Sequence, residues 1–389
     1  MRPGAIQFTP MERVVFGTPA AAAVAAEAQR LHAARVFVVA SRTLATRTDE
    51  VARIAAALGE RHAGTFDGIG AHAPQENVVA CANAAREAGA DLVVAVGGSS
   101  IADAGKIVPL CLEHGVRTVD DLAPFRATVD AEGRRHYPDF RPPRVPVVCV
   151  PTTLSGGEFH FRSGARHAGL NIKHSFAVPG MAARSVVLDP AVTVHTPREL
   201  WMSTGVRAVD HAVETLASLD ANAYTDGAAW QALRLLGPGL RRVMADPGDL
   251  DARLDCQIGA WCSMGGIVAG MRMGASHGIG HMMGGVFGVP HGITSCVMLA
   301  PVLRYNEAVN GKLDAAIAAA LGGAGRRAGD VVADLVRELQ LPGTLHDVGI
   351  GDADLPELAR MSLRDDWTHS NPRPIRSADD VMRILETCR

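Results

Sequence analysis

Four histidines in the C-terminal half of this chain have the type and spacing to bind a metal ion or transfer a proton. His277, His281 and His291 lie in the segment GASHGIGHMMGGVFGVPHG, and His211 lies upstream in STGVRAVDHAVE. His277 and His281 are four residues apart, so they would share one face of a helix. Imidazole is a common metal ligand and a common proton carrier near neutral pH, so the four could form one functional cluster. The alternative is that they are interior histidines hydrogen-bonded to carbonyl groups.

A second candidate site is the glycine-rich turn in AVGGSSIADAGK, residues 95–106, which follows a strand pattern and opens a helix pattern. Its glycines allow a tight turn and close approach of a ligand to the backbone. The serines and the helix N-terminus offer N–H donors to a phosphate. The motif lacks the spacing of G-x-G-x-x-G, so a strand-to-helix turn capped by serine is the alternative. The candidate cofactor-binding residues here are Gly97, Gly98, Ser99, Ser100 and Asp103.

A third candidate is the loop VPTTLSGGEF, residues 150–159, where Thr152, Thr153 and Ser155 supply hydroxyl groups. In an open α/β sheet, ligands bind outside the carboxyl ends of the strands. Two loops of glycines and hydroxyl side chains after two strands therefore favour a dinucleotide lying across that edge.

Two different patterns divide the chain and predict the elements that position these residues. Up to about residue 190, short strands rich in β-branched residues alternate with alanine-rich helices, which predicts an α/β domain with a parallel sheet. From Pro197 onward the pattern is helical throughout. We expect an α/β dinucleotide-binding domain over residues 1–193 and an all-helical domain over residues 194–389. The predicted strands cover residues 35–40, 91–96, 146–150 and 185–188.

Composition narrows the class of protein. The chain has 389 residues, a formal charge of −3 and only 4% aromatic residues, which argues against a nucleic-acid binder. Seven dispersed cysteines without a C-x-x-C pair indicate reduced thiols. No apolar run fits a signal peptide or a membrane span. We expect a cytoplasmic protein, a homodimer by base rate, that acts on a small molecule.

The order of motifs resembles the iron-containing (group III) alcohol dehydrogenase family over essentially the whole chain. The resemblance rests on GGSS with its following Asp and Lys, PTTLSGGE, LDPAVT, TGVRAVDHAVE, ASHGIGH…VPHG and NPRPI. ERVVFG, TFDGIGAHAP and PTTLSGGE are most similar to the maleylacetate-reductase-like branch. The resemblance implies the dehydroquinate synthase-like fold, with nicotinamide and a divalent metal held in a cleft between the two domains.

The resemblance also implies roles for single residues. His211, His277 and His291 match three metal ligands, and His281 matches the histidine beside the nicotinamide and substrate. The fourth ligand of the alcohol dehydrogenases is an aspartate, and its position here is Arg207. Maleylacetate reductases also lack this aspartate, which implies reduction without a metal, so iron or zinc is a doubtful cofactor here. Arg207 is instead a candidate catalytic residue that holds a substrate carboxylate, unless it forms an ion pair with Asp210 or Glu214.

A second difference from the family's sequence pattern concerns the choice between NADH and NADPH. Ser41, followed by Arg42, stands where NAD-preferring relatives often carry an aspartate for the ribose hydroxyls. Without that acid the site would not repel a 2′-phosphate, and Arg42 could bind one. We therefore expect NADPH to be used, alone or beside NADH.

The predicted function is reduction of a carbonyl group or an activated enoate by NAD(P)H. The substrate would be an aldehyde, a ketone or an oxo-acid such as maleylacetate. His281 is the expected proton donor, and Arg207 with protonated histidines would stabilise the oxyanion if no metal does. Two alternatives remain: a lyase or cyclase like dehydroquinate synthase, and a catalytically silent nucleotide-binding protein.

Overall fold

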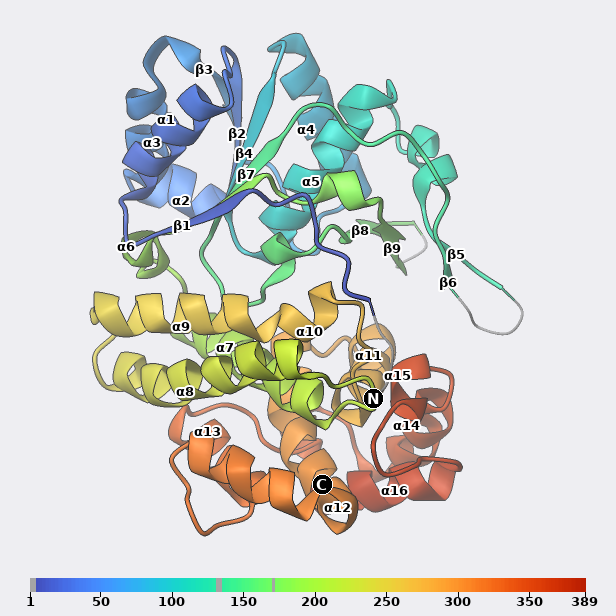
Figure 1. Ribbon diagram of the computed structural model, residues 1–389. Coiled ribbons are helices and arrows are strands. Elements are labelled where there is room, and N and C mark those ends of the chain that lie inside the picture. The colour runs from blue at the N-terminus through green and yellow to red at the C-terminus, as the bar shows by residue number, and fades with distance from the viewer. Residues whose placement is uncertain (1–4, 131–134, 170–171) are drawn as a thin grey trace. The chain divides into compact units, whose positions relative to one another are not determined.

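The computed structural model describes residues 5–130, 135–169 and 172–389 (Figure 1). The chain forms two compact units, which we describe separately. One is Phe8–His195, and the other is Thr196–Arg389 with the described part of Met1–Gln7. All seven cysteines lie in the described residues and are unpaired. None of the described helices is long and apolar enough to cross a membrane.

The first unit is built on a parallel sheet of six strands, as the alternating pattern predicts. In spatial order the strands are β1 (Arg13–Phe16), β10 (Ser185–Leu188), β7 (Val147–Pro151), β4 (Leu92–Gly97), β2 (Val36–Ala40) and β3 (His62–Phe66). The strands β10, β7, β4 and β2 are buried along their whole length, because helices cover both faces of the sheet. These are the strands predicted from the β-branched runs.

The helices of the first unit connect the strands, except α6, which follows the last strand. They are α1 (Ala20–Arg30), α2 (Arg42–Arg47), α3 (Glu50–Leu58), α4 (Gln75–Glu87), α5 (Ser99–Glu113) and α6 (Pro190–Thr193). Apolar residues of α1 and α3, such as Val24 and Ile54, pack with the valines of β2 and β4. Helices α4 and α5 pack against each other, and α5 also packs against β4 and β7. Two short antiparallel pairs complete the unit: β5 (Thr128–Val129) with β6 (Arg135–His136), and β8 (Ser163–His167) with β9 (Ile172–Phe176).

The strand order creates a switch point at the carboxyl edge of the sheet. From β2 the chain runs outward to β3 and then returns to the other side of β2 to form β4. Open α/β sheets bind ligands where the order reverses in this way. The loop after β2 begins at Ser41, and the loop after β4 begins with the predicted phosphate turn.

The second unit is helical, as predicted. Its longer helices are α7 (Arg198–Ala217), α8 (Ala223–Ala245), α9 (Leu250–Ser263), α11 (Ala275–Phe287), α12 (His291–Ala320) and α13 (Ala328–Glu338). Its shorter helices are α10 (Gly265–Val268), α14 (Leu355–Ser362), α15 (Asp366–His369) and α16 (Ala378–Leu385). Helix α12 packs against both α7 and α11, and α15 packs against α11. This arrangement brings the histidine segments together, since α7 carries His211, α11 carries His277 and His281, and α12 opens with His291.

Candidate active site

Three loops of the first unit converge at the switch point. A Cβ placed on Gly98 would lie 3.0 Å from Thr153 Cγ2, and one on Gly97 would lie 3.3 Å from Ser41 Cβ. Gly97 also has a φ of +155°, which favours glycine. The amide of Thr152 donates to the carbonyl of Gly97 at 3.1 Å, and that of Ser41 donates to Val96 at 3.0 Å. The loops after β2, β4 and β7 are therefore held side by side, as the sequence predicts for a nucleotide edge.

The N-terminus of α5 has the features of an anion-binding site. Gly98 is its N-cap, and no side chain caps the first N–H groups. These groups carry the positive end of the helix dipole. A phosphate beside Gly98 would accept from them without meeting a side chain of residue 98, so this cradle fits the pyrophosphate of a dinucleotide.

Several of the predicted hydroxyl groups already have partners within the protein. Ser100 Oγ accepts from the amide of His72 at 2.9 Å, and Ser41 Oγ caps α2 by accepting from Leu44. Thr153 Oγ1 and Ser155 Oγ form a hydrogen bond of 2.7 Å. The hydroxyl groups of Ser41 and Ser100 thus hold the loops in shape.

Charged groups flank this edge. Lys173 of β9 forms an ion pair with Asp103, with 3.0 Å between Nζ and Oδ2. Sequence reasoning missed Lys173, which lies 70 residues from Asp103 and belongs to no motif. Arg42 is 76% exposed, and its Nε lies 3.8 Å from Asp67 Oδ2. Its contact with a 2′-phosphate remains a prediction.

Lys106, the last residue of the glycine-rich segment, is completely buried. Its Nζ donates to the carbonyls of Gly157, His160 and Arg162 at 2.7, 2.8 and 2.8 Å. Burial lowers the pKa of this ammonium group. The three bonds fix the segment that continues from Thr153 and Ser155, so α5 positions the second loop as well as the first.

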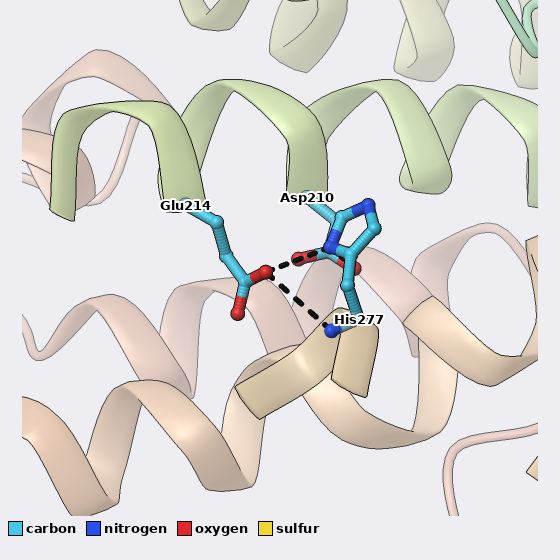
Figure 2. A group of neighbouring side chains, drawn as sticks. All are labelled: Asp210, Glu214 and His277. Atoms are coloured by element: carbon cyan, nitrogen blue, oxygen red, sulfur yellow. Dashed lines mark hydrogen bonds and ion pairs between the residues drawn. The ribbon is translucent and has the colours of Figure 1, made fainter. Parts of the chain in front are cut away.

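In the second unit, α7 presents two buried carboxyl groups to the start of α11 (Figure 2). Glu214 accepts from the amides of Gly274 and Ser276 at 2.8 Å each, and its Oε2 lies 2.7 Å from His277 Nδ1. It therefore caps α11, whose own N-cap is a glycine. Burial raises the pKa of Glu214 to about 7.

The second carboxyl group, Asp210, connects three helices. Its Oδ2 accepts from Ser276 Oγ of α11 at 2.8 Å and from Ser295 Oγ of α12 at 2.6 Å. The same oxygen lies 3.5 Å from His277 Nδ1. Burial raises the pKa of Asp210. Ser295 Oγ also accepts from Arg207 Nη1 at 3.0 Å, which ties Arg207 to this network.

Arg207 does not form the alternative ion pair with Asp210 or Glu214. Within the described chain its guanidinium makes one hydrogen bond, to Ser295, and no ion pair. Burial lowers its pKa, but arginine starts so high that the group stays charged. The remaining N–H donors are available for an anion.

The rings of His211 and His277 are stacked, with 5.1 Å between their centroids. Burial places the pKa of each well below its usual value, and the nearby positive charge of Arg207 contributes to both shifts. The expectation that protonated histidines assist Arg207 is therefore wrong for these two residues, because a buried imidazole beside a guanidinium stays neutral.

His281 lies one turn further along α11 and is partly exposed. Its Nδ1 is 2.9 Å from Asp365 Oδ2, and its ring centroid is 5.1 Å from that of Trp367. The ring of His291 lies 6.4 Å from that of His281. Asp365 and Trp367 were not predicted from the sequence, since 84 residues separate Asp365 from His281.

The histidines match a divalent metal site only in part. Among the described residues, His277 Nε2 and His211 Nδ1 are buried without a hydrogen-bond partner, as open ligand positions would be. The only described group with three ligand atoms within 4.8 Å of one another is Asp210, Glu214 and His277. Donors of the protein engage Glu214 and Asp210 Oδ2, although Asp210 Oδ1 is buried without a partner, and Arg207 occupies the position that the resemblance assigns to a fourth ligand. The donor set does not fit a tightly bound divalent cation, so we derive no step through one.

Comparisons with known proteins agree with these features. The family model for iron-containing alcohol dehydrogenase matches residues 11–190, and the model for the C-terminal part of the Fe-containing alcohol dehydrogenase family matches residues 201–388. The chain therefore belongs to the iron-containing alcohol dehydrogenase family. It is an NAD(P)-dependent oxidoreductase of the maleylacetate-reductase-like type.

Individual relatives cover nearly the whole chain. Dehydrogenase ALT3 of Alternaria alternata is 33% identical over 91% of this chain and 99% of its own. Maleylacetate reductase 2 of Cupriavidus pinatubonensis is 32% identical over 96% of this chain and 93% of its own. The crystal structure of maleylacetate reductase from Agrobacterium tumefaciens superimposes with a TM-score of 0.83 at 28% identity, covering 100% of this chain and 98% of that one. These relatives favour an oxidoreductase over the lyase and the silent nucleotide-binding protein.

Proposed function

We propose that this protein uses NAD(P)H to reduce the carbonyl group or activated C=C bond of an oxo-acid, and that maleylacetate is the first compound to test. The observation that carries the proposal is Arg207, a partly buried guanidinium beside His211 and His277 that has no carboxylate partner in the described chain. Asp210 and Glu214 act on this guanidinium only without direct contact, and a substrate carboxylate would supply the direct partner that it lacks. The names of the reductase relatives agree with such a substrate.

The cofactor would be bound by the converging loops of the first unit. Gly97, Gly98 and Ser99 would surround the pyrophosphate, and Thr152 and Thr153 would contact the nucleotide from the neighbouring loop. Ser100, Asp103 and Ser155 stand beside these contacts, and Ser41 and Arg42 would face the adenosine ribose. When bound, the dihydronicotinamide supplies a hydride.

The histidine cluster would supply the remaining chemistry. Arg207 would hold the acid group of the substrate and stabilise the oxygen that gains negative charge. His281 is partly exposed, unlike His277, and would deliver the proton to that oxygen. His211, His277 and His291 remain candidate ligands for a weakly held metal, and no step above depends on one.

The test compares Arg207→Lys with the parent protein on acidic and neutral substrates, following the absorbance of NADH or NADPH. Lysine keeps the charge but loses the planar pair of donors. We expect kcat/KM for maleylacetate and other oxo-acids to fall by about tenfold or more, and by clearly less for neutral aldehydes, which lose only the contact to the developing oxyanion. Equal effects on both classes of substrate would remove Arg207 from substrate recognition.

Arg253→Lys is a matched control for Arg207→Lys. Arg253 is also in the helical unit, 3% exposed, with its guanidinium 4.8 Å from the ring centre of Trp201. Replacing it tests what a buried arginine-to-lysine change does to folding. We expect its ratio of acidic to neutral activity to equal that of the parent.

A further inference from the structure

The two oxygens of the Asp365 carboxylate contact different groups. Oδ1 accepts from the amide of Trp367 at 2.9 Å and so caps α15. Oδ2 lies 2.9 Å from His281 Nδ1. The carboxylate is 18% exposed and the imidazole 32%, so the pair is partly shielded from water while His281 stays accessible.

Close packing between two helices fixes this pair. Helix α15 lies on α11 at Gly278, where an added Cβ would come within 2.6 Å of the backbone nitrogen of Thr368. Thr368 is fully buried. Only glycine permits this approach. The backbone of α15 therefore contacts α11 at Gly278, which is one residue after His277 and three residues before His281. The ring of Trp367 lies 5.7 Å from that of His277 and 5.1 Å from that of His281, so it packs beside both histidines.

This geometry determines which nitrogen of His281 can act on a substrate. An ionised carboxylate only accepts hydrogen bonds, so the His281 nitrogen next to it carries a proton. The other nitrogen, Nε2, is then the one that exchanges its proton. A carboxylate that holds an imidazole in this way selects its tautomer and orientation.

We propose that Asp365 is a positioning residue for reduction, acting through His281; the proposal rests on the role of His281 as proton donor in the proposed function. The hydride that dihydronicotinamide would supply adds to the carbonyl carbon, or to the far carbon of a C=C bond conjugated with the carbonyl. In both cases the π electrons shift to the carbonyl oxygen, and the proton leaves His281 Nε2 for that oxygen to give the alcohol or the enol. The imidazolium becomes neutral imidazole. It keeps the proton on Nδ1, which stays hydrogen-bonded to Asp365 Oδ2. Water then returns a proton to Nε2 before the next turnover.

Asp365→Asn tests the proposal with little disturbance of the fold, because asparagine is nearly isosteric and an equally good N-cap. We expect kcat to fall by about tenfold or more, since the amide no longer selects the tautomer. The KM for NAD(P)H and the melting temperature should stay close to the parent values. The substrate is the member of the oxo-acid panel that the parent reduces fastest.

Asp249→Asn is the matched control. Asp249 is also an N-cap in the helical unit, 23% exposed, with Oδ1 accepting from the amide of Ala252 at 2.9 Å. It pairs with Arg242 and not with a histidine. We expect this variant to keep the parent's kcat. If Asp365→Asn behaves like Asp249→Asn while His281→Ala is slow, Asp365 is only a helix cap and the proposal is overturned.

The double variant His281→Ala with Asp365→Asn separates the two hypotheses. If Asp365 acts through His281, its replacement costs nothing further once the imidazole is gone, and the double variant matches His281→Ala. Fully additive losses would show that Asp365 acts independently of His281 and would overturn the proposal. A normal kcat for His281→Ala alone would instead refute the proton-donor role itself.

Discussion

Replacing Lys106 with methionine should destabilise the nucleotide-binding unit strongly, although Lys106 is not expected to touch the cofactor. The side chain is fully buried and donates to three backbone carbonyls of one loop segment. Methionine has a similar length and fills the same space, so the change removes the charged donor without creating a large cavity.

The size of the effect follows from the partners that are left behind. A buried carbonyl that loses its partner costs about 1–3 kcal/mol. The bond to His160 is buried and those to Gly157 and Arg162 are partly buried, so the three together cost at most roughly 3–9 kcal/mol. The variant no longer has to bury an ammonium group, which recovers several kcal/mol. We expect a net loss of about 3 kcal/mol, because this gain offsets only part of the cost of the unpaired carbonyls. For a unit of this size the melting temperature would fall by roughly 6–12 °C.

Thermal unfolding followed by circular dichroism measures this change, with Lys173→Met as the matched control. Lys173 is 40% exposed and pairs with one carboxylate, so its loss should cost only about 0–1 kcal/mol. A fall in melting temperature for Lys106→Met no larger than that of the control would refute the reasoning. It would mean that the carbonyls of Gly157, His160 and Arg162 find other partners.

Three further predictions concern the phosphate turn, a buried carboxyl group and metal content. Gly98→Val would place a branched side chain against Thr153 and should abolish NAD(P)H binding in a calorimetric titration with the fold retained, whereas unchanged affinity would make the loop a simple turn. Burial raises the pKa of Glu158 from 4.5 to about 7, so the stability this group contributes at low pH is lost as pH rises through that window. Glu158→Gln should therefore be more stable than the parent above pH 7, by up to about 3 kcal/mol in urea unfolding, with no such gain below pH 4.5; a pH-independent difference would contradict this. The purified protein should hold little metal and remain active after EDTA treatment, and tightly bound iron or zinc whose removal stops turnover would show the opposite.

The central strands could be predicted from the sequence because burial on both faces requires a continuous run of apolar residues. β2, β4, β7 and β10 are buried on both faces and are therefore continuous runs of valine and similar residues. β1 and β3 were missed. They lie at the two edges of the sheet and are only partly buried, so neither shows such a run.

The same distinction holds for the candidate site. Features set by nearby residues could be predicted from the sequence, and contacts between distant segments could not. The spacing of four residues is enough to place His277 and His281 on one face of α11. It says nothing about which groups approach that face. The pairing of His281 with Asp365 depends on α15 packing at Gly278, and that of Asp103 with Lys173 depends on the β8–β9 hairpin. Such contacts are set by tertiary packing between segments far apart in the chain.

Arg207 shows how tertiary packing changes the chemistry that a helix offers. Its own helix carries Asp210 and Glu214, and from the sequence either could neutralise it. In the folded unit, Ser276 and Ser295 engage Asp210, while Glu214 caps α11 and binds His277. The carboxylates nearest in sequence are therefore occupied in joining α7, α11 and α12. The guanidinium keeps one serine as its partner and retains donors for an anion. The contacts that hold the three helices together thus also leave Arg207 with free donors, which is the basis on which we propose an acidic substrate.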